Sequence, residues 1–159
     1  MKVVFRVDSS LEIGIGHFMR CLTLAEALID KDAEVSFVCS DLQGNICDIA
    51  EAKGISVYML PNDTDASSGT EMINVILSNQ RDKADWLVVD SYVLGDKWES
   101  QMRPFVKNIL VIDDLADRSH DCDILLDQNY FKNINQRYDG LVPVHCAKYL
   151  GPKYALLRK

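Results

Sequence analysis

The chain has 159 residues, of which 48% are hydrophobic and 26% are charged, and its formal net charge is −7. This balance is typical of a globular domain and excludes a disordered tail, a collagen-like fibre and a coiled coil. The acidic charge and the lack of a Lys/Arg cluster argue against nucleic-acid binding, which needs a basic surface. No apolar run is long enough for a transmembrane helix, and Arg6 and Asp8 interrupt the first apolar stretch, where a signal peptide needs an uncharged segment. We therefore expect a cytoplasmic protein.

The cysteines predict neither a disulfide framework nor a zinc site. Their number is odd, their spacings are wide and no C-x-x-C motif occurs. We expect each to pack as a small buried hydrophobe. They are Cys21, Cys39, Cys47, Cys122 and Cys146.

Apolar segments with strand and helix periodicity alternate along the chain. Strands are predicted at 2–7, 34–39, 55–60, 85–89, 109–112, 124–126 and 147–150. Helices are predicted at 18–29 and 43–53, after a capping box of Ser68 and Glu71, and after a second capping box of Asp96 and Glu99, with Pro104 ending the last. This alternation indicates right-handed βαβ crossovers and an α/β fold with a mostly parallel sheet covered on both faces.

Four of the predicted strands end in polar residues. Ligands of parallel sheets bind outside the carboxyl ends of the strands, so these residues favour one shared cleft over separate helix caps and solvated turns. The four endings are Asp8-Ser9-Ser10, Asp90-Ser91-Tyr92, Asp113-Asp114 and Asp127-Gln128-Asn129.

The loop after the first strand carries Gly14, Gly16 and His17 just before a helix. Glycines let the backbone turn tightly and approach a ligand, and the amides of a helix N-terminus attract anions. The third glycine of a dinucleotide fingerprint and the lysine of a P-loop are both missing. The helix dipole disfavours a charged imidazole at His17 and leaves a ring that can accept a proton. The alternative is a histidine that only caps its own helix, and the sequence leaves both interpretations open.

Other candidate residues have simpler interpretations. We expect His120 and His145 at the surface, since they lie in polar or irregular stretches. Asp113 and Asp114 form a carboxylate pair that could bind Mg²⁺, or act as caps or sugar contacts. We expect both tryptophans, Trp86 and Trp98, to serve packing.

Several sequence blocks together resemble the N-terminal half of a known family. It comprises the UDP-2,4-diacetamido-2,4,6-trideoxy-β-L-altropyranose hydrolases of pseudaminic acid biosynthesis, grouped with spore-coat polysaccharide proteins. The blocks are Phe5-Arg6-Val7-Asp8-Ser9-Ser10, Ile13-Gly14-Ile15-Gly16-His17, Arg20-Cys21-Leu22, Val89-Asp90-Ser91-Tyr92, Ile112-Asp113-Asp114-Leu115-Ala116-Asp117, His120-Asp121-Cys122-Asp123-Ile124-Leu125-Leu126-Asp127-Gln128-Asn129 and Tyr154-Ala155-Leu156-Leu157-Arg158.

The resemblance implies a GT-B fold, in which two Rossmann-like lobes flank a cleft. It implies cleavage of the bond between sugar C1 and UDP by water, with inversion and with no metal or other cofactor, which argues against Mg²⁺ at Asp113 and Asp114. It implies that residues 1–150 form the N-terminal lobe and that 151–159 begin the linker to a C-terminal lobe. That lobe, absent from this chain, would hold the UDP, so we expect little activity from the chain alone.

The resemblance also implies roles for individual residues. His17 matches the family's catalytic base, and Tyr92 is expected to help position the attacking water. Residues expected to shape the pocket are Asp8, Gly14, Gly16 and Arg20. Expected sugar contacts are Asp90, Asp113, Asp127 and Asn129.

Two rival functions remain at this point. A glycosyltransferase of the same fold would use the base to deprotonate an acceptor hydroxyl, and release of free sugar without an acceptor would distinguish it from a hydrolase. A non-catalytic sugar-binding lobe would work only with a partner chain. Finding the missing lobe encoded directly downstream would weaken that alternative. The patterns do not specify an oligomeric state.

Overall fold

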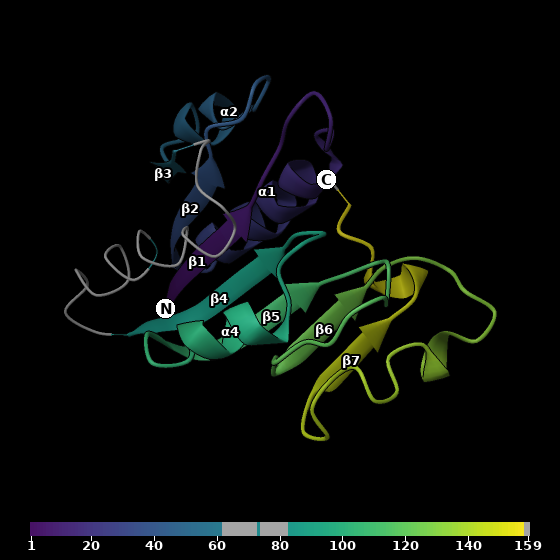
Figure 1. Cartoon of the computed structure of the whole chain (residues 1–159). Helices are drawn as coiled ribbons and strands as arrows, with labels where there is room; N and C mark the ends of the chain where they lie inside the picture. Colours follow the sequence, from purple (N-terminus) through teal and green to yellow (C-terminus); the bar gives the residue numbers. More distant parts are fainter. Residues whose placement is uncertain (62–72, 74–82, 158–159) are drawn as a thin grey trace.

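A computed structural model describes residues 1–61, 73 and 83–157 of the chain. Within them, seven parallel strands form one sheet in the order β3-β2-β1-β4-β5-β6-β7 (Figure 1). The strands are β1 (Lys2–Val7), β2 (Glu34–Ser40), β3 (Ser56–Leu60), β4 (Ala84–Asp90), β5 (Val106–Ile112), β6 (Ile124–Asp127) and β7 (Ala147–Leu150). The described helices are α1 (Gly16–Ile29), α2 (Asp48–Glu51) and α4 (Asp96–Met102), with short 3-10 turns η1 (Ile134–Gln136) and η2 (Pro152–Tyr154). The predicted α/β fold is confirmed, and its strand order is Rossmann-like.

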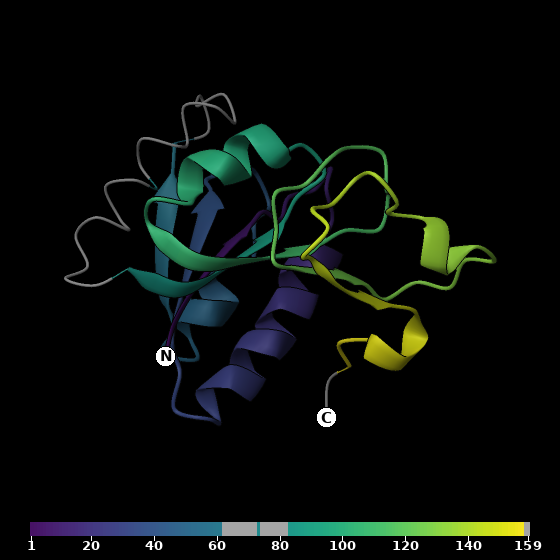
Figure 2. The same ribbon diagram turned by 90° about the horizontal axis from the view of Figure 1, so that it is seen from below.

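Helices lie on both faces of the sheet, as predicted. Figure 2 shows α1 on one face and α4 on the other. Two buried clusters follow from this arrangement, one between α1 and the sheet and one between α4 and the sheet. On the α1 side, Phe18, Cys21, Leu22 and Ala25 recur at helical spacing and are all buried.

Strand β1 shows how the alternation of a strand serves both clusters. Val4 packs in the cluster on the α4 side. Val3, Phe5 and Val7 pack on the α1 side, where Phe5 stacks on Phe37 with ring centroids 4.9 Å apart. Successive side chains of a strand point to opposite faces, so a strand with buried apolar side chains on both faces must be covered twice. This places β1 at the centre of the sheet, paired with β2 and β4.

The predicted helix at 43–53 is wrong in length, because only Asp48–Glu51 is helical. Gly44 has a φ of +77°, and the Asn45 side chain donates a hydrogen bond to the Leu42 carbonyl oxygen at 2.9 Å. A left-handed glycine and a local amide contact favour a turn over a helix.

The predicted capping box at Asp96 and Glu99 is also wrong. Gly95 is the N-cap of α4 and makes no side-chain cap hydrogen bond, and Glu99 is fully buried with partners outside the helix. Pro104 follows the end of α4 at Met102, as predicted. The capping box predicted at Ser68 and Glu71 lies outside the described residues.

The five cysteines are buried free thiols, as predicted. Trp98 is buried in the α4-side cluster and Trp86 packs against the α1-side cluster, which confirms packing roles for both. Among the described residues, we find no helix with the length and apolar character needed to cross a membrane.

Candidate active site

The four strands with polar endings are neighbours in the sheet. The order β1-β4-β5-β6 is continuous and parallel, so their carboxyl ends lie along one edge. The strand order reverses direction between β1 and β4, and α1 begins beside this point. Such switch points are where open parallel sheets bind ligands.

The loop from Asp8 to Gly16 is held in shape by its own hydrogen bonds. The Gly14 N–H donates to the Ser10 carbonyl oxygen at 2.8 Å, and the Ser10 Oγ accepts from the Ile13 N–H at 3.0 Å. Gly14 has a φ of +82°, a conformation that glycine adopts without strain. A Cβ added at Gly16 would meet no heavy atom within 4 Å, so open space lies at the start of α1.

His17 is held by Asp90, from the end of β4. Its Nδ1 lies 2.5 Å from Asp90 Oδ1, and both side chains are buried. Nδ1 also lies 3.1 Å from Arg20 Nη2, but because an ionised carboxylate only accepts hydrogen bonds, we assign the proton to Nδ1 in its shorter contact with Asp90. Within the described part of the chain, no hydrogen bond is made by the other ring nitrogen, Nε2, which is the proton acceptor whenever the ring is neutral and Nδ1 carries the proton. The interpretation of His17 as a cap of its own helix is not supported, since the N-cap of α1 makes no side-chain hydrogen bond.

Arg20, one turn further along α1, grips the same carboxylate. Its Nε donates to Asp90 Oδ2 at 2.5 Å and its Nη2 to Asp90 Oδ1 at 2.6 Å, while Nη1 reaches Asp114 Oδ2 at 3.3 Å. Burial opposes ionisation of Asp90, but the hydrogen bonds from Arg20 and His17 outweigh it and lower the pKa of this carboxyl. Asp90 is therefore an ionised carboxylate that is held in place next to Nδ1 of His17.

Tyr92 lies on the loop that follows β4, and its ring contacts the ring of His17 on α1. The two rings are edge to face with centroids 4.4 Å apart. Tyr92 is 43% exposed whereas His17 is 7% exposed, so the tyrosine links the buried imidazole to the surface. This pair brings the start of α1 next to the loop that follows β4.

Asp8 lies in a neighbouring group of contacts. One of its carboxylate oxygens accepts from Arg6 Nη1 at 2.5 Å and from the Ser40 N–H at 2.7 Å. Burial opposes ionisation, but Arg6 and the Ser40 hydrogen bonds lower the pKa of Asp8. These contacts tie the ends of β1 and β2 together.

Asp127 and Asp113 are almost completely buried at the ends of β6 and β5. Asp127 accepts hydrogen bonds from the Asn129 N–H at 3.0 Å and from the Tyr138 hydroxyl at 3.0 Å. Asp113 accepts from the Ala116 N–H at 2.9 Å. Burial opposes ionisation of Asp113, but His120, Ala116 and Arg118 lower its pKa. Both carboxylates thus order the loops around them.

The prediction that His120 lies at the surface is wrong. Its ring is buried, with Nδ1 2.8 Å from Glu99 Oε1 and Nε2 3.9 Å from Asp113 Oδ2. Burial opposes a charge on this ring, but the two carboxylates raise the pKa of His120 to about 9. His145 is exposed, as predicted.

The sequence reasoning also missed Glu99 and Arg118. The sequence pattern predicts Glu99 as a capping-box residue, but its place between Trp98 and Met102, on a helix whose other buried positions are apolar, also fits a buried side chain. Nothing in the local sequence marks the hydrogen bonds of Arg118 to the Ser91 and Leu94 carbonyl oxygens.

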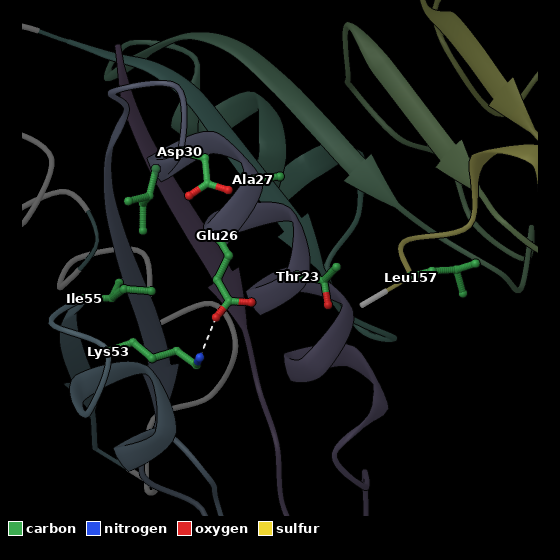
Figure 3. Close-up of a pocket in the computed structure, with 8 residues that line it drawn as sticks. Thr23, Glu26, Ala27, Asp30, Lys53, Ile55 and Leu157 are labelled. Atoms are coloured by element: carbon green, nitrogen blue, oxygen red, sulfur yellow. Dashed lines mark ion pairs between the residues drawn. The ribbon is translucent and has the colours of Figure 1, made fainter. Parts of the chain in front are cut away.

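Two of the hollows that lie along α1 bear on where the site is. One of about 350 Å³ adjoins the site and includes Gly16, Arg20 and Leu156 in its lining. The other, of about 640 Å³, lies further along the helix and is crossed by an ion pair between Lys53 and Glu26 at 2.5 Å (Figure 3). It contains none of the clustered residues around His17, so we place the site at the strand ends. Across the described residues, no group of three or more His, Cys, Asp or Glu side chains is arranged to hold a metal ion.

Comparison with known proteins gives one informative match. The chain is 36% identical, over 166 aligned positions, to the UDP-2,4-diacetamido-2,4,6-trideoxy-beta-L-altropyranose hydrolase of Campylobacter jejuni subsp. jejuni serotype O:2 (strain ATCC 700819 / NCTC 11168). The predicted resemblance to these UDP-sugar hydrolases is confirmed. The alignment covers 100% of this chain and 53% of the hydrolase, so the chain spans about half the length of this relative. No protein-family model matches the chain.

Proposed function

We propose that this chain carries the catalytic half of a nucleotide-sugar hydrolase. The observation that supports this most directly is the buried pair of His17 and Asp90 beside a half-exposed Tyr92, in a chain 36% identical to a UDP-sugar hydrolase. The substrate class proposed is a UDP-linked diacetamido-trideoxy hexose, as in the name of the relative. The products are UDP and the free sugar, which the resemblance connects with nonulosonic (pseudaminic) acid and surface polysaccharide synthesis.

In the proposed reaction, Nε2 of His17 takes a proton from a water molecule. The water oxygen forms a bond to sugar C1, while the bond between C1 and the diphosphate oxygen breaks and its electron pair leaves with UDP. A general base must lie within hydrogen-bond distance of the water, about 2.6–3.2 Å. Attack from the face opposite UDP inverts the anomeric centre.

The neighbours of His17 suit this role. Asp90 keeps the proton on Nδ1 and stabilises the imidazolium that forms during the reaction. Arg20 fixes Asp90 through two hydrogen bonds, so that the base and its support move together. We assign Tyr92 to hold the water, and Gly14 and Gly16 to leave room for the sugar at the start of α1.

We assign the remaining predicted residues to the loops around the site, which they order or from which they contact the sugar. Asp8 joins the ends of β1 and β2. Asp113 and Asp127 order the loops after β5 and β6, and Asn129 offers its side chain to the sugar from the second of these loops. No metal ion or other cofactor has a part in this reaction.

We further propose that the hydrolase has a GT-B arrangement, with this chain as its N-terminal lobe. Donors for the leaving UDP would then come from a second lobe. The relative's length supports this, since 47% of it lies outside the match (100% less the matched 53%).

A turnover assay tests the proposal. The substrate is UDP-2,4-diacetamido-2,4,6-trideoxy-β-L-altropyranose in water enriched in ¹⁸O, given to the chain alone and to the chain fused to the part of the C. jejuni relative outside the match. We expect free sugar without an added acceptor, ¹⁸O in the sugar and not in UDP, and much faster turnover by the fusion. His17→Asn should abolish turnover and leave substrate binding intact. Turnover that requires an acceptor would instead indicate a glycosyltransferase, and unchanged turnover by His17→Asn would remove the role of this residue.

A further inference from the structure

Arg118 makes hydrogen bonds to the backbone of the loop that carries Tyr92. This arginine lies on the segment between β5 and β6, and its side chain is 17% exposed. Its Nε donates to the Leu94 carbonyl oxygen at 2.8 Å, and its Nη2 donates to the Ser91 carbonyl oxygen. The two carbonyl groups bracket Tyr92 and Val93, so one guanidinium spans the turn.

The guanidinium is itself held on both sides. Its Nη2 lies 3.3 Å from Asp113 Oδ1, and its Nη1 donates to Asp117 Oδ1 at 2.7 Å. The backbone that leads to Arg118 makes a tight turn at Ala116, which has a φ of +52° and donates its N–H to Asp113 Oδ2. A left-handed alanine is uncommon and persists where surrounding contacts fix it.

The residues after Arg118 fasten the same segment to α4. The Asp96 N–H donates to the Ser119 carbonyl oxygen at 2.9 Å. The carboxylate of Glu99 binds the His120 ring at 2.8 Å and the Asp121 N–H at 2.6 Å. Arg118 is thereby attached to a buried support, whereas Tyr92 is 43% exposed. Fixing the backbone on both sides of Tyr92 limits the positions that its exposed ring can take.

We propose that Arg118 is a positioning residue that sets the place of Tyr92 against His17. The proposal rests on the proposed function for its effect on catalysis, since it gives the water-holding tyrosine a fixed distance from the base. Arginine suits this task because its planar fork presents several donors in a rigid geometry, which lysine cannot reproduce.

The edge-to-face contact of Tyr92 and His17 provides a direct readout. The chemical shifts of the His17 ring protons depend on the nearby Tyr92 ring, and the chain has only three histidines to distinguish. Tyr92→Leu defines the shifts of His17 without that ring. Arg103→Met is the matched control, because Arg103 makes hydrogen bonds of 2.7 Å to the Asp121 carboxylate and 3.1 Å to the Asp121 carbonyl oxygen, yet touches no residue of the Tyr92 turn.

In Arg118→Met we expect the His17 shifts to move at least halfway toward the Tyr92→Leu values, and in Arg103→Met to stay at the wild-type values. Unchanged His17 shifts in folded Arg118→Met would overturn the proposal, as would equal changes in the two arginine variants. If Arg118→Met does not fold, Arg118→Lys decides, with an intermediate shift expected and an unchanged shift overturning the proposal.

An activity measurement adds the catalytic consequence. In the hydrolase fusion we expect Arg118→Met to lower kcat by about 10- to 100-fold with KM changed by less than about threefold, because a small misplacement of a positioned group slows the reaction more than it weakens binding. Absence of hydrolysis in the wild-type fusion would refute the proposed function alone, since the His17 shifts still test the position of Tyr92.

Discussion

Asp90 and His17 lie 73 positions apart in the sequence and meet at 2.5 Å, where the end of β4 faces the first turn of α1. Because of this contact, the two nitrogens of the imidazole differ in their hydrogen bonding. Nδ1 donates to a carboxylate whose two oxygens also accept hydrogen bonds from Arg20, and Nε2 makes no hydrogen bond among the described residues. The pair therefore resembles the orienting half of a base assembly more than a structural ion pair.

Replacing Asp90 with asparagine should disturb the imidazole while keeping the volume of the side chain. An amide cannot act as the fixed anion that favours the proton on Nδ1, so a fraction of His17 should shift its proton to Nε2. In the hydrolase fusion, kcat should fall by roughly 100-fold or more. The nitrogen chemical shifts of the His17 ring measure the tautomer directly. Asp114→Asn is the control, since Asp114 touches Arg20 but not His17, and a kcat loss as large in that variant would contradict the assignment.

Gly14 and Gly16 should respond differently to alanine. Gly14→Ala forces a Cβ into a φ of +82° and should lower the free energy of unfolding by about 1 kcal/mol. Gly16→Ala meets open space in the first turn of a helix and should leave stability unchanged within about 0.5 kcal/mol. Urea unfolding of both variants checks this order. In the fusion, Gly16→Ala should weaken substrate binding if the sugar occupies that space, and unaltered binding would mean that it does not.

Much of the fold was predictable because its signals are local. The strands at 2–7 and 147–150 match the structure in both bounds, and the others differ by a few residues at their ends. The rule that parallel strands present their carboxyl ends to one edge then brought Asp8, Asp90, Asp113 and Asp127 to the same rim. The helix at 43–53 was over-predicted, because the turn at Gly44 and Asn45 outweighs the helical pattern.

The inner contacts of the site were not predictable from local patterns. The segment around His120 is polar, so it was expected at the surface, and the carboxylate of Glu99 that makes burial tolerable lies 21 positions away. Likewise, local sequence patterns do not tell whether the carboxylate of Asp90 or of Asp113 faces a substrate or other groups of the protein. Those choices depend on long-range pairing of charges in the folded chain.

Tyr138 offers a test of the buried network at the ends of β5 and β6. Its hydroxyl donates to Asp127 Oδ2 at 3.0 Å and lies 3.1 Å from the Asp113 carbonyl oxygen, and the side chain is fully buried. Tyr138→Phe removes these contacts and leaves the carboxylate with one donor fewer, so the free energy of unfolding should fall by about 1–2 kcal/mol. Tyr130→Phe, at a ring that is 79% exposed, should change it by less than about 0.5 kcal/mol. Equal effects in urea unfolding would show that the Tyr138 hydroxyl adds nothing to stability.

His120 should make the stability of the protein depend on alkaline pH. Its pKa in the folded chain is raised from 6.5 to about 9, so the folded state binds the proton more tightly than the unfolded state. The resulting stabilisation is fully present below pH 6.5 and is lost as the pH rises through about 9. Its size is on the order of 3 kcal/mol. Urea unfolding at several pH values across this range measures the loss.

In His120→Gln the chain should be less stable at pH 6.5, because Glu99 and Asp113 lose their cation. Its free energy of unfolding should also change less with pH, because the titrating group is gone. His145→Gln, at an exposed ring, should keep the wild-type slope, and a wild-type slope in His120→Gln as well would mean that His120 is not the group responsible.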